Sequence, residues 1–200
     1  MHDIIIRRAN ENDDFTKIAE ILYHTDPYIY PTAFGNNTAE ASQAISILIM
    51  AEGSVFDFRN MFVAVANDTI CGVILYNESG AAWDSEKYYN LIRRHIPNKQ
   101  KFIFTADNYF IEQATKPEAN HVEIIALSVS KPYQRMGIAT MLLGAFIQEY
   151  NSKTIQLDVL ADNAGAIRLY SKFGFMRTAQ TKGFSYTDDT KPDCYRMVRN

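Results

Sequence analysis

The sequence predicts an α/β (α+β) fold in which a mixed, mostly antiparallel sheet is flanked by helices. Its 200 residues are enough for one domain with a sizeable core, so residues 1–200 are expected to form a single domain. Two β-rich runs flank the pair Asn67-Asp68, which is typical of a hairpin turn. Residues 122–160 follow the order strand, helix, strand, which indicates one parallel pair joined by a crossover helix.

The first 76 residues are expected to form a strand, two helices and the hairpin. A strand at 3–9 precedes a polar helix start and then apolar residues at helical spacing: Phe15, Ile18, Ala19 and Leu22. Pro27 and Pro31 interrupt this pattern, so residues 28–30 are expected to form a tyrosine-rich loop. Thr38 is the expected cap of the second helix, and the hairpin strands are expected at 61–66 and 69–76.

Residues 77–120 carry the least regular pattern. Helical pieces are expected at 84–95 and 108–115, each followed by a proline. The segment is long for a structureless connection. We therefore expect a variable insertion between the third and fourth strands, with a role in function or at an interface.

The remaining residues have a sharper pattern. A nearly continuous apolar strand at 122–129 is expected near the centre of the sheet. A polar turn at 130–137 leads into a helix with the apolar stripe Ile138, Met141, Leu142, Ala145 and Phe146. A strand at 154–160 follows, and Asp162 is expected to cap a short helix that ends at Gly174. Two more strands are expected at 175–181 and 194–198.

The composition is that of an ordinary globular protein and argues against several functions. Hydrophobic residues make up 47%, charged residues 22% and the net charge is -3, so no nucleic-acid partner is expected. No apolar run approaches the roughly 20 residues that span a bilayer, and no signal-peptide core is present, so no membrane partner is expected. The two isolated cysteines, Cys71 and Cys194, predict no metal site and a cytoplasmic location.

The turn between Val129 and Ile138 has the features of a phosphate site. A strand that enters a helix through a glycine-containing turn exposes backbone N–H groups at the positive end of the helix dipole. Gly137 permits close approach of a ligand, and Gln134 and Arg135 can add donors. Ordinary helix starts often have a similar composition, so the turn taken by itself favours a purely structural role over a phosphate site.

Two motifs in sequence order indicate a family. Gln134-x-x-Gly137-x-Ala139 resembles the Gln/Arg-x-x-Gly-x-Gly/Ala signature of the GNAT superfamily of acyl-CoA N-acyltransferases, which includes the acetyltransferases. About 25 residues downstream, the segment 162–175 resembles the second motif of the same superfamily, with Asn163, the pair Leu169-Tyr170 and a Lys-x-Gly-Phe ending. The resemblance extends over 122–180. Over 3–76 it rests on the order of elements alone, and it is absent over 77–120.

The resemblance implies a GNAT-like fold with a splayed parallel strand pair that holds acetyl-CoA (coenzyme A). It places the pyrophosphate on the backbone of the turn: Gln134, Arg135, Met136, Gly137, Ile138, Ala139 and Thr140. It places the pantetheine arm along the backbone of Leu127 and Val129. Asn163 matches the position that touches the pantetheine or the end of the cofactor. Tyr170 matches the tyrosine that lies near the thioester sulfur.

Acyl transfer to an amine requires a proton acceptor and a proton donor. An amine attacks only when neutral, and a lysine-type ammonium has a pKa of about 10.4, so a group or a water chain must remove a proton. Glu123 is the candidate base and His121 the alternative, although a glutamate at a strand end is often only solvated. Tyr170 is the candidate acid; a core tyrosine packed near Phe173 is the structural alternative. Neither cysteine has a recognisable base partner, which favours direct transfer.

The acceptor remains open among small-molecule and peptide amines. Aromatic residues of the less regular segments are candidates to line its pocket, or equally to pack lids and interfaces: Tyr28, Tyr30, Phe34, Trp83, Tyr88, Tyr89, Tyr109 and Phe110. One rival function is a non-catalytic acyl-CoA sensor or scaffold of the same fold. Another is binding of a different phosphorylated ligand, although neither common nucleotide-binding glycine motif is present. A homodimer is the default expectation for oligomeric state.

Overall fold

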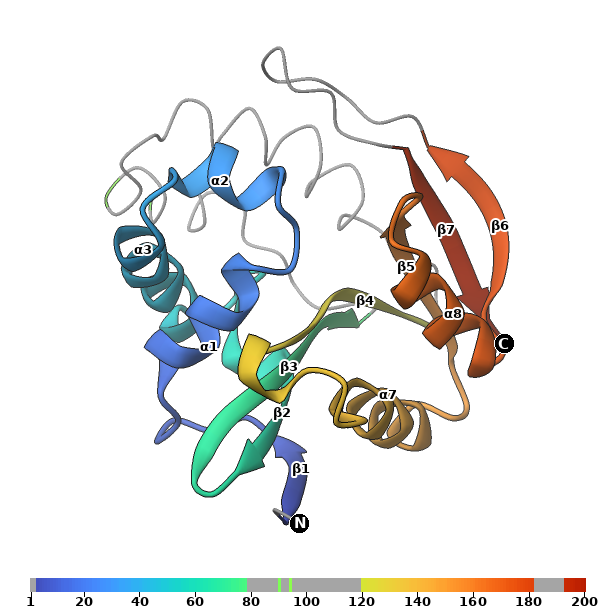
Figure 1. Cartoon of the computed structure of the whole chain (residues 1–200), viewed down its shortest axis with the longest axis horizontal. Helices are drawn as coiled ribbons and strands as arrows, with labels where there is room; N and C mark the ends of the chain where they lie inside the picture. The colour runs from blue at the N-terminus through green and yellow to red at the C-terminus, as the bar shows by residue number, and fades with distance from the viewer. Residues whose placement is uncertain (1–2, 79–89, 91–93, 95–119, 182–192) are drawn as a thin grey trace.

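The computed structural model of the protein describes residues 3–78, 90, 94, 120–181 and 193–200. Within them, one seven-stranded sheet has the order β1 (Ile4–Arg8), β2 (Met61–Ala66), β3 (Thr69–Glu78), β4 (His121–Val129), β5 (Thr154–Leu160), β7 (Cys194–Arg199) and β6 (Met176–Thr181), as Figure 1 shows. Neighbouring strands are antiparallel except for the parallel pair β4 and β5. The predicted mixed, mostly antiparallel sheet is confirmed.

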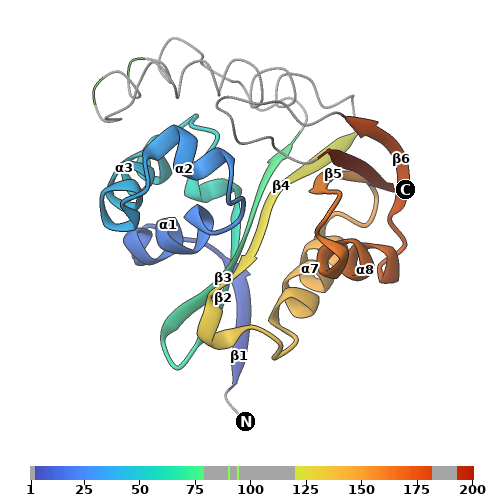
Figure 2. The same ribbon diagram turned by 45° about the horizontal axis from the view of Figure 1, so that its top comes forward.

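Side chains alternate between the two faces of the sheet, and each face carries its own buried cluster. On β2, Met61 and Val63 belong to one cluster, whereas Phe62 and Ala64 belong to the other. The first cluster includes residues of α1 (Phe15–Tyr23), α2 (Ile29–Phe34) and α3 (Thr38–Met50). The second includes residues of α7 (Ile138–Glu149) and α8 (Ala164–Lys172). The two groups of helices therefore cover opposite faces of the sheet, as Figure 2 shows.

The hairpin prediction is confirmed at the turn between β2 and β3. Asn67 and Asp68 have φ angles of 48° and 57°, and two successive residues with positive φ are what a type I′ turn requires. Asn and Asp enter this left-handed region more readily than most residues. The turn fixes the register in which Ala66 lies opposite Thr69.

The tyrosine-rich loop predicted at 28–30 is wrong, because α2 begins at Ile29 and includes Pro31. Proline is tolerated there because the first turn of a helix does not use its backbone N–H groups. The Asp26 carboxylate satisfies two of those groups by accepting hydrogen bonds from the N–H groups of Tyr28 at 2.8 Å and Ile29 at 2.9 Å. Pro31 therefore lies in the first turn of α2 and does not prevent the helix from forming.

Two predicted helix caps are displaced by one residue. Asn37, not Thr38, caps α3, and its side-chain oxygen accepts from the N–H of Ala39 at 3.1 Å. Asn163, not Asp162, caps α8. In both places the asparagine competes with an adjacent residue that can cap equally well, and the position of the helix decides between them.

The helix α7 departs from its predicted apolar stripe at one position. Met141 is 40% exposed, whereas Leu143 is fully buried beside Ile138, Leu142 and Phe146. The predicted stop of α8 at Gly174 is confirmed by a positive φ of 85°, a conformation that glycine adopts without strain.

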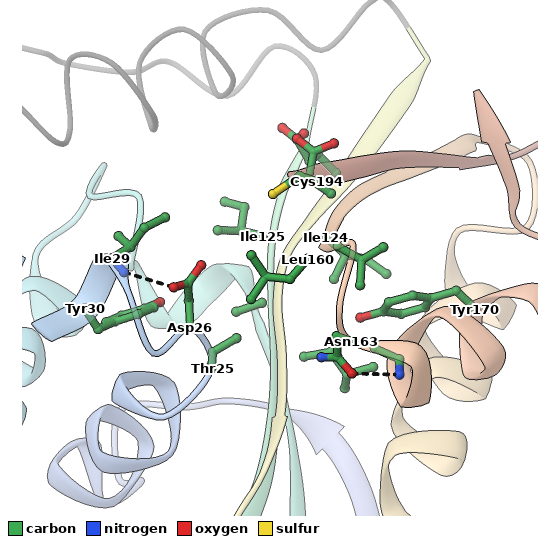
Figure 3. A pocket seen from close by; sticks show the side chains of 16 residues that line it. Thr25, Asp26, Ile29, Tyr30, Ile124, Ile125, Leu160, Asn163, Tyr170 and Cys194 are labelled. Atoms are coloured by element: carbon green, nitrogen blue, oxygen red, sulfur yellow. Dashed lines mark hydrogen bonds between the residues drawn. The ribbon is translucent and has the colours of Figure 1, made fainter. Parts of the chain in front are cut away.

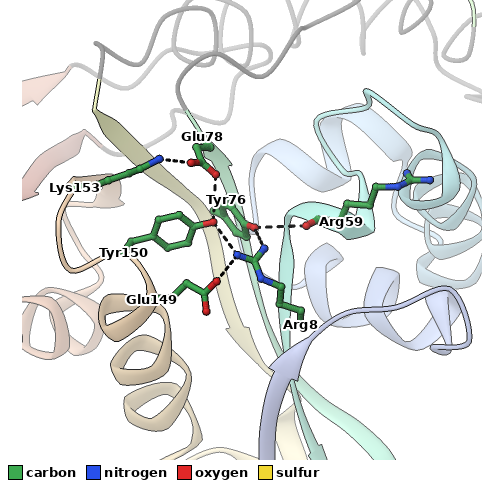
Figure 4. A network of polar contacts seen from close by, with 7 residues as sticks. All are labelled: Arg8, Arg59, Tyr76, Glu78, Glu149, Tyr150 and Lys153. Atoms are coloured by element: carbon green, nitrogen blue, oxygen red, sulfur yellow. Dashed lines mark hydrogen bonds and ion pairs between the residues drawn. The ribbon is translucent and has the colours of Figure 1, made fainter.

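A polar network ties the edge strand β1 to the C-terminal end of α7 (Figure 4). Arg8 donates to the Tyr76 hydroxyl on β3 and to a Glu149 carboxylate oxygen at 2.7 Å. Its guanidinium also donates to the Tyr150 hydroxyl at 3.2 Å and lies 5.0 Å from the centre of the Phe62 ring. Since a cation is favourable at a helix C-terminus, these contacts help to fix α7, whose other end follows the turn after β4.

The helices predicted at 84–95 and 108–115 lie almost entirely outside the described residues. Only Asn90 and Arg94 are described in that segment, and both are helical and exposed. Among the helices that the structure describes, none is long and apolar enough to cross a membrane.

Candidate active site

Strands β4 and β5 lie side by side at first and then part. Their pairing runs from His121 opposite Thr154 to Ile124 opposite Leu157, and no further pair joins the described parts of these strands. Both strands continue beyond that point, and a cavity of about 130 Å³ opens between them (Figure 3). This is the splayed parallel pair that the two motifs implied.

Three parts of the fold enclose the cavity. Residues 123–127 of β4 and 158–160 of β5 form its floor. One wall comes from the end of α1 and the start of α2; the other comes from α8 and β7. These walls are formed by Thr25, Asp26, Ile29 and Tyr30 on one side, and by Asn163, Ala166, Tyr170 and Cys194 on the other. A mostly apolar cavity with a few converging polar side chains is typical of a ligand site.

Glu123 projects from β4 into this apolar environment and is 5% exposed. Burial raises the pKa of its carboxyl to about 7; the nearby Asp158 adds to this rise, while Arg196 opposes it. The Arg196 Nη2 lies 3.6 Å from Glu123 Oε1. A carboxyl that titrates near neutrality can accept a proton at physiological pH.

Tyr170 lies on α8, and its hydroxyl points into the cavity, as Figure 3 shows. The residue is 7% exposed, and its ring centre lies 5.7 Å from that of Phe175. Burial raises the pKa of the hydroxyl well above its ordinary value. The phenol therefore stays protonated and can donate a proton. Tyr170 belongs both to the buried core and to the cavity wall. A structural role in the core is therefore compatible with the predicted role as an acid.

The turn after β4, predicted to hold a phosphate, leaves the N-terminus of α7 open. The Gln134 side chain donates from Nε2 to the Val129 carbonyl oxygen at 3.0 Å, which braces the turn. Arg135 and Gly137 have φ angles of 65° and 82°, so the chain turns sharply before α7. No side chain caps the first N–H groups of α7 within the described chain. A Cβ added at Gly137 would meet no described atom within 4 Å, so a ligand has room to approach these N–H groups.

The predicted cofactor residues are thus placed in two neighbouring regions. Leu127 and Asn163 line the cavity, while Arg135, Met136 and Thr140 are exposed around the turn. The side chain of Ile138 is buried and Ala139 is half-buried, so these two residues can offer only backbone groups. The Asn163 side-chain oxygen Oδ1 accepts from the Ala166 N–H at 3.0 Å, which leaves the side-chain NH₂ for a ligand.

Two predicted residues have a different position. Val129 does not line the cavity, and its carbonyl oxygen already accepts from Gln134. His121, the alternative base, lies at the start of β4 outside the cavity lining. The structure therefore favours Glu123 over His121 as the titratable group near a bound ligand.

Several lining residues were not identified from the sequence. Asp26, Asp158 and Cys194 line the cavity, and Arg196 lies beside it. Asp26 precedes Pro27, a context typical of helix starts, and Asp158 faces the same side as Glu123 by strand alternation, so these two carried a weak signal. Arg196 reaches the site only because β7 pairs with β5, which no local pattern indicates.

The aromatic candidates divide into three groups. Tyr30 lines the cavity. Phe34 packs in the core, with its ring centre 6.2 Å from that of Phe56, and Tyr28 lies outside the lining. The others lie outside the described residues: Trp83, Tyr88, Tyr89, Tyr109 and Phe110. The described residues contain no cluster of His, Cys, Asp and Glu that could hold a metal ion.

A cavity at a strand splay, lined by a buried carboxyl and a buried phenol, is an arrangement expected of an acyl-CoA-dependent N-acyltransferase. The chain belongs to the acetyltransferase (GNAT) family, since the sequence model of that family matches residues 40–175.

Individual relatives agree with this assignment. The chain is 38% identical over 80 residues to an N-alpha-acetyltransferase of Saccharolobus solfataricus, a match that covers 38% of this chain and 46% of that protein. It is 28% identical over 121 residues to the ribosomal protein bS18 alanine N-acetyltransferase of Escherichia coli K12, covering 59% of this chain and 75% of that protein. The chain thus spans about half the length of curated relatives such as the first.

The fold is shared with solved structures. An N-acetyltransferase from Staphylococcus aureus Mu50 superposes with a TM-score of 0.66 at 16% identity, over 98% of this chain and 100% of that one. This likeness confirms the GNAT-like fold.

Proposed function

We propose that this protein is an N-acetyltransferase that moves an acetyl group from acetyl-CoA to a primary amine by direct transfer. The observation that carries the proposal is that Glu123 and Tyr170 line one cavity at the strand splay. One side chain can accept a proton near neutral pH, and the other stays protonated. Acyl transfer to an amine needs both properties.

The residues around the turn and the splay fit acetyl-CoA. The N–H groups at the start of α7 would hold the pyrophosphate, with Gln134 bracing the turn and Arg135 adding a positive charge. The β4 backbone at Leu127 and the amide of Asn163 would hold the pantetheine arm. When bound, acetyl-CoA supplies a thioester whose carbonyl carbon is attacked by the amine.

Glu123 and Tyr170 then have complementary tasks. Glu123, directly or through a water, accepts the proton that the ammonium must lose before it can attack. Tyr170 donates a proton to the sulfur as the C–S bond breaks, and it regains one from the amine nitrogen, which loses its second proton on becoming an amide. We infer direct transfer with no acyl-cysteine, since Cys71 is buried outside the cavity lining and the sequence around Cys194 shows no recognisable base motif.

The acceptor supported best is the α-amine of a peptide or protein. An α-ammonium has a pKa of about 7.7–8.0, close to that of Glu123, whereas a lysine ammonium has a pKa of about 10.4 and gives up its proton less readily to this base. The carboxyls of Asp26 and Asp158 in the lining favour a cation and disfavour the free carboxylate of an amino acid. The names of the Saccharolobus and Escherichia relatives point the same way.

An acceptor comparison tests this function. The purified chain is incubated with acetyl-CoA and three acceptors: a peptide with a free N-terminus, the same peptide with a blocked N-terminus and a free lysine, and a free amino acid. We expect mass spectrometry to find acetyl groups on the free α-amine of the peptide, at a rate at least tenfold above the other two. Preference for the lysine or the free amino acid would contradict the proposed acceptor.

The main alternative is an acyl-CoA sensor or scaffold that does not catalyse. CoA binding without acetyl transfer to any amine would favour that alternative. The cytoplasmic location, the homodimer, and the single domain over 1–200 with an insertion at 77–120 stay predictions.

A further inference from the structure

Arg196 connects two carboxyl groups from neighbouring strands. Its Nε and Nη2 lie 2.6 and 2.7 Å from the two Asp158 carboxylate oxygens, and both donate to them. Its Nη2 also lies 3.6 Å from Glu123 Oε1, beyond a normal hydrogen bond. The guanidinium is therefore bound in a bidentate fashion by Asp158 and only loosely by Glu123.

The strand order creates this arrangement. Asp158 lies opposite Arg196 in the antiparallel pair β5–β7, and Glu123 lies opposite Gln156 in the parallel pair β4–β5. Since alternate residues of a strand share a face, Asp158 and Gln156 project to the same side. Side chains of three successive strands thus meet at the cavity.

Among the residues that the structure describes, few charged groups face Glu123 from the surrounding elements. Arg196 lies beside the cavity, and besides Asp158 the titratable side chains that line it with Glu123 are Asp26 and Tyr30 from the α1–α2 wall, Tyr170 from α8 and Cys194 from β7. The charges of Arg196 and Asp158 act on Glu123 in opposite directions, and Gln156 adds a hydrogen bond to it. Asp158 and Arg196 are therefore the charged pair that acts on the carboxyl.

We propose that Asp158 and Arg196 are positioning residues for the base: Asp158 occupies the guanidinium, so that Arg196 holds the Glu123 carboxyl at the cavity without locking it in an ion pair. This inference rests on the proposed function, in which Glu123 takes up the proton of the amine. A tight Arg196–Glu123 pair would fix the carboxylate and weaken it as a base. Because Asp158 takes two of the guanidinium donors at close range, Glu123 stays able to exchange protons.

The two partners should act on Glu123 in opposite directions. Asp158→Asn removes the competing charge, so Arg196 pairs with Glu123 and the titration midpoint of Glu123 falls by about one pH unit or more. Arg196→Met removes the positive charge and leaves Asp158 beside Glu123, so the midpoint rises by about the same amount. Arg196→Lys keeps the positive charge but cannot hold both Asp158 oxygens, so its midpoint should rise less than that of Arg196→Met.

The experiment measures the titration of Glu123 directly. Carbon-13 NMR follows the glutamate side-chain carboxyls from pH 4 to 9, and the Glu123 signal is assigned by its loss in Glu123→Gln. In parallel, the acid limb of kcat/KM for a peptide acceptor is recorded for each folded variant. Ionisation of the acceptor amine is the same in all variants, so a difference between their limbs reports on the enzyme.

We expect the Glu123 titration midpoints of Asp158→Asn and Arg196→Met to move in opposite directions, and the acid limb of kcat/KM to move with them. Midpoints that do not differ between the two variants, or that move in the same direction, would overturn the proposed positioning role. Midpoints that move while the acid limb of kcat/KM stays in place would overturn it as well. If Arg196→Met fails to fold, the near-isosteric Asp158→Asn carries the test, compared with Arg196→Lys. A protein with no acetyl transfer at all would instead show that the proposed function has failed, because the NMR midpoints are measured without turnover.

Discussion

At the scale of single residues, one physical cause, desolvation, gives the side chains of Glu123 and Tyr170 different protonation states near neutral pH. In both, burial favours the uncharged form over the charged form. For the carboxyl this means titration near neutrality, so that proton acceptance and release are both accessible. For the phenol it means that the proton is retained across the physiological range.

Glu123→Gln is expected to stabilise the protein at alkaline pH. The folded-state pKa of about 7 lies above the ordinary value of 4.5, so the folded state resists ionisation of this carboxyl. Its contribution to stability is fully present below about pH 4.5 and is lost as the pH rises through 7. We expect the Tm of the variant to exceed that of the unmodified protein by roughly 5 °C at pH 8, with no gain at pH 4.5.

Differential scanning calorimetry at the two pH values checks this expectation. Glu149→Gln is the matched control, because the Glu149 side chain is 46% exposed and its ion pair with Arg8 lies away from the cavity. A Glu123→Gln variant that is less stable than the unmodified protein at pH 8 would contradict the raised pKa.

The sequence identified both residues but not their environment. Tyr170 was placed by its motif, and Glu123 by its position on the strand that the motif turn follows. A glutamate at a strand end is ordinarily solvated, and only the packing of β4 against β5 and α8 shows that Glu123 is buried. Burial depends on neighbours that are distant in sequence, so the pKa of Glu123 could not be predicted.

At the scale of elements, the turn before α7 is the part that sequence reasoning described best. The turn, the helix start and the glycine in a left-handed conformation are all local features, and local features are encoded in adjacent residues. The errors have a local explanation as well. The helix α2 was missed because Pro31 was assigned a breaking effect that it does not have in a first turn, and two caps were displaced because adjacent residues compete.

Gly137→Glu and Gly137→Ala separate backbone strain from loss of the anion site. Both variants place a side chain at a φ of 82°, so each should lose about 1 kcal/mol of stability. Only the glutamate adds a negative charge to the N-terminus of α7. At a hundredfold excess over its Kd, CoA should raise the stability of the native protein and of Gly137→Ala by about 2.7 kcal/mol.

Thermal unfolding with and without CoA measures this difference. We expect the CoA-dependent rise in Tm to be retained in Gly137→Ala and lost in Gly137→Glu. An equal response of the two variants would mean that charge at the helix start does not affect binding.

At the scale of the whole molecule, two separate parts of the fold form the cavity. The half that contains β4, α7, β5 and α8 holds the cofactor motifs, whereas the α1–α2 segment closes the cavity from the other side (Figures 2 and 3). The motif half could be predicted because its signals lie within 60 consecutive residues. The α1–α2 wall and Arg196 could not, since Asp26 and Arg196 join the site only through the order of strands and helices around it.

The central claim is that Glu123 and Tyr170 carry out acetyl transfer in a site that binds acetyl-CoA without them. The most direct test compares kcat and the Kd for acetyl-CoA among the unmodified protein, Glu123→Gln and Tyr170→Phe, with a peptide acceptor at saturation. We expect kcat to fall by roughly 10²–10⁴-fold in each variant while the Kd changes by only a few-fold, because proton transfer is lost and the turn before α7 is intact. Variants that keep the unmodified kcat would contradict the account.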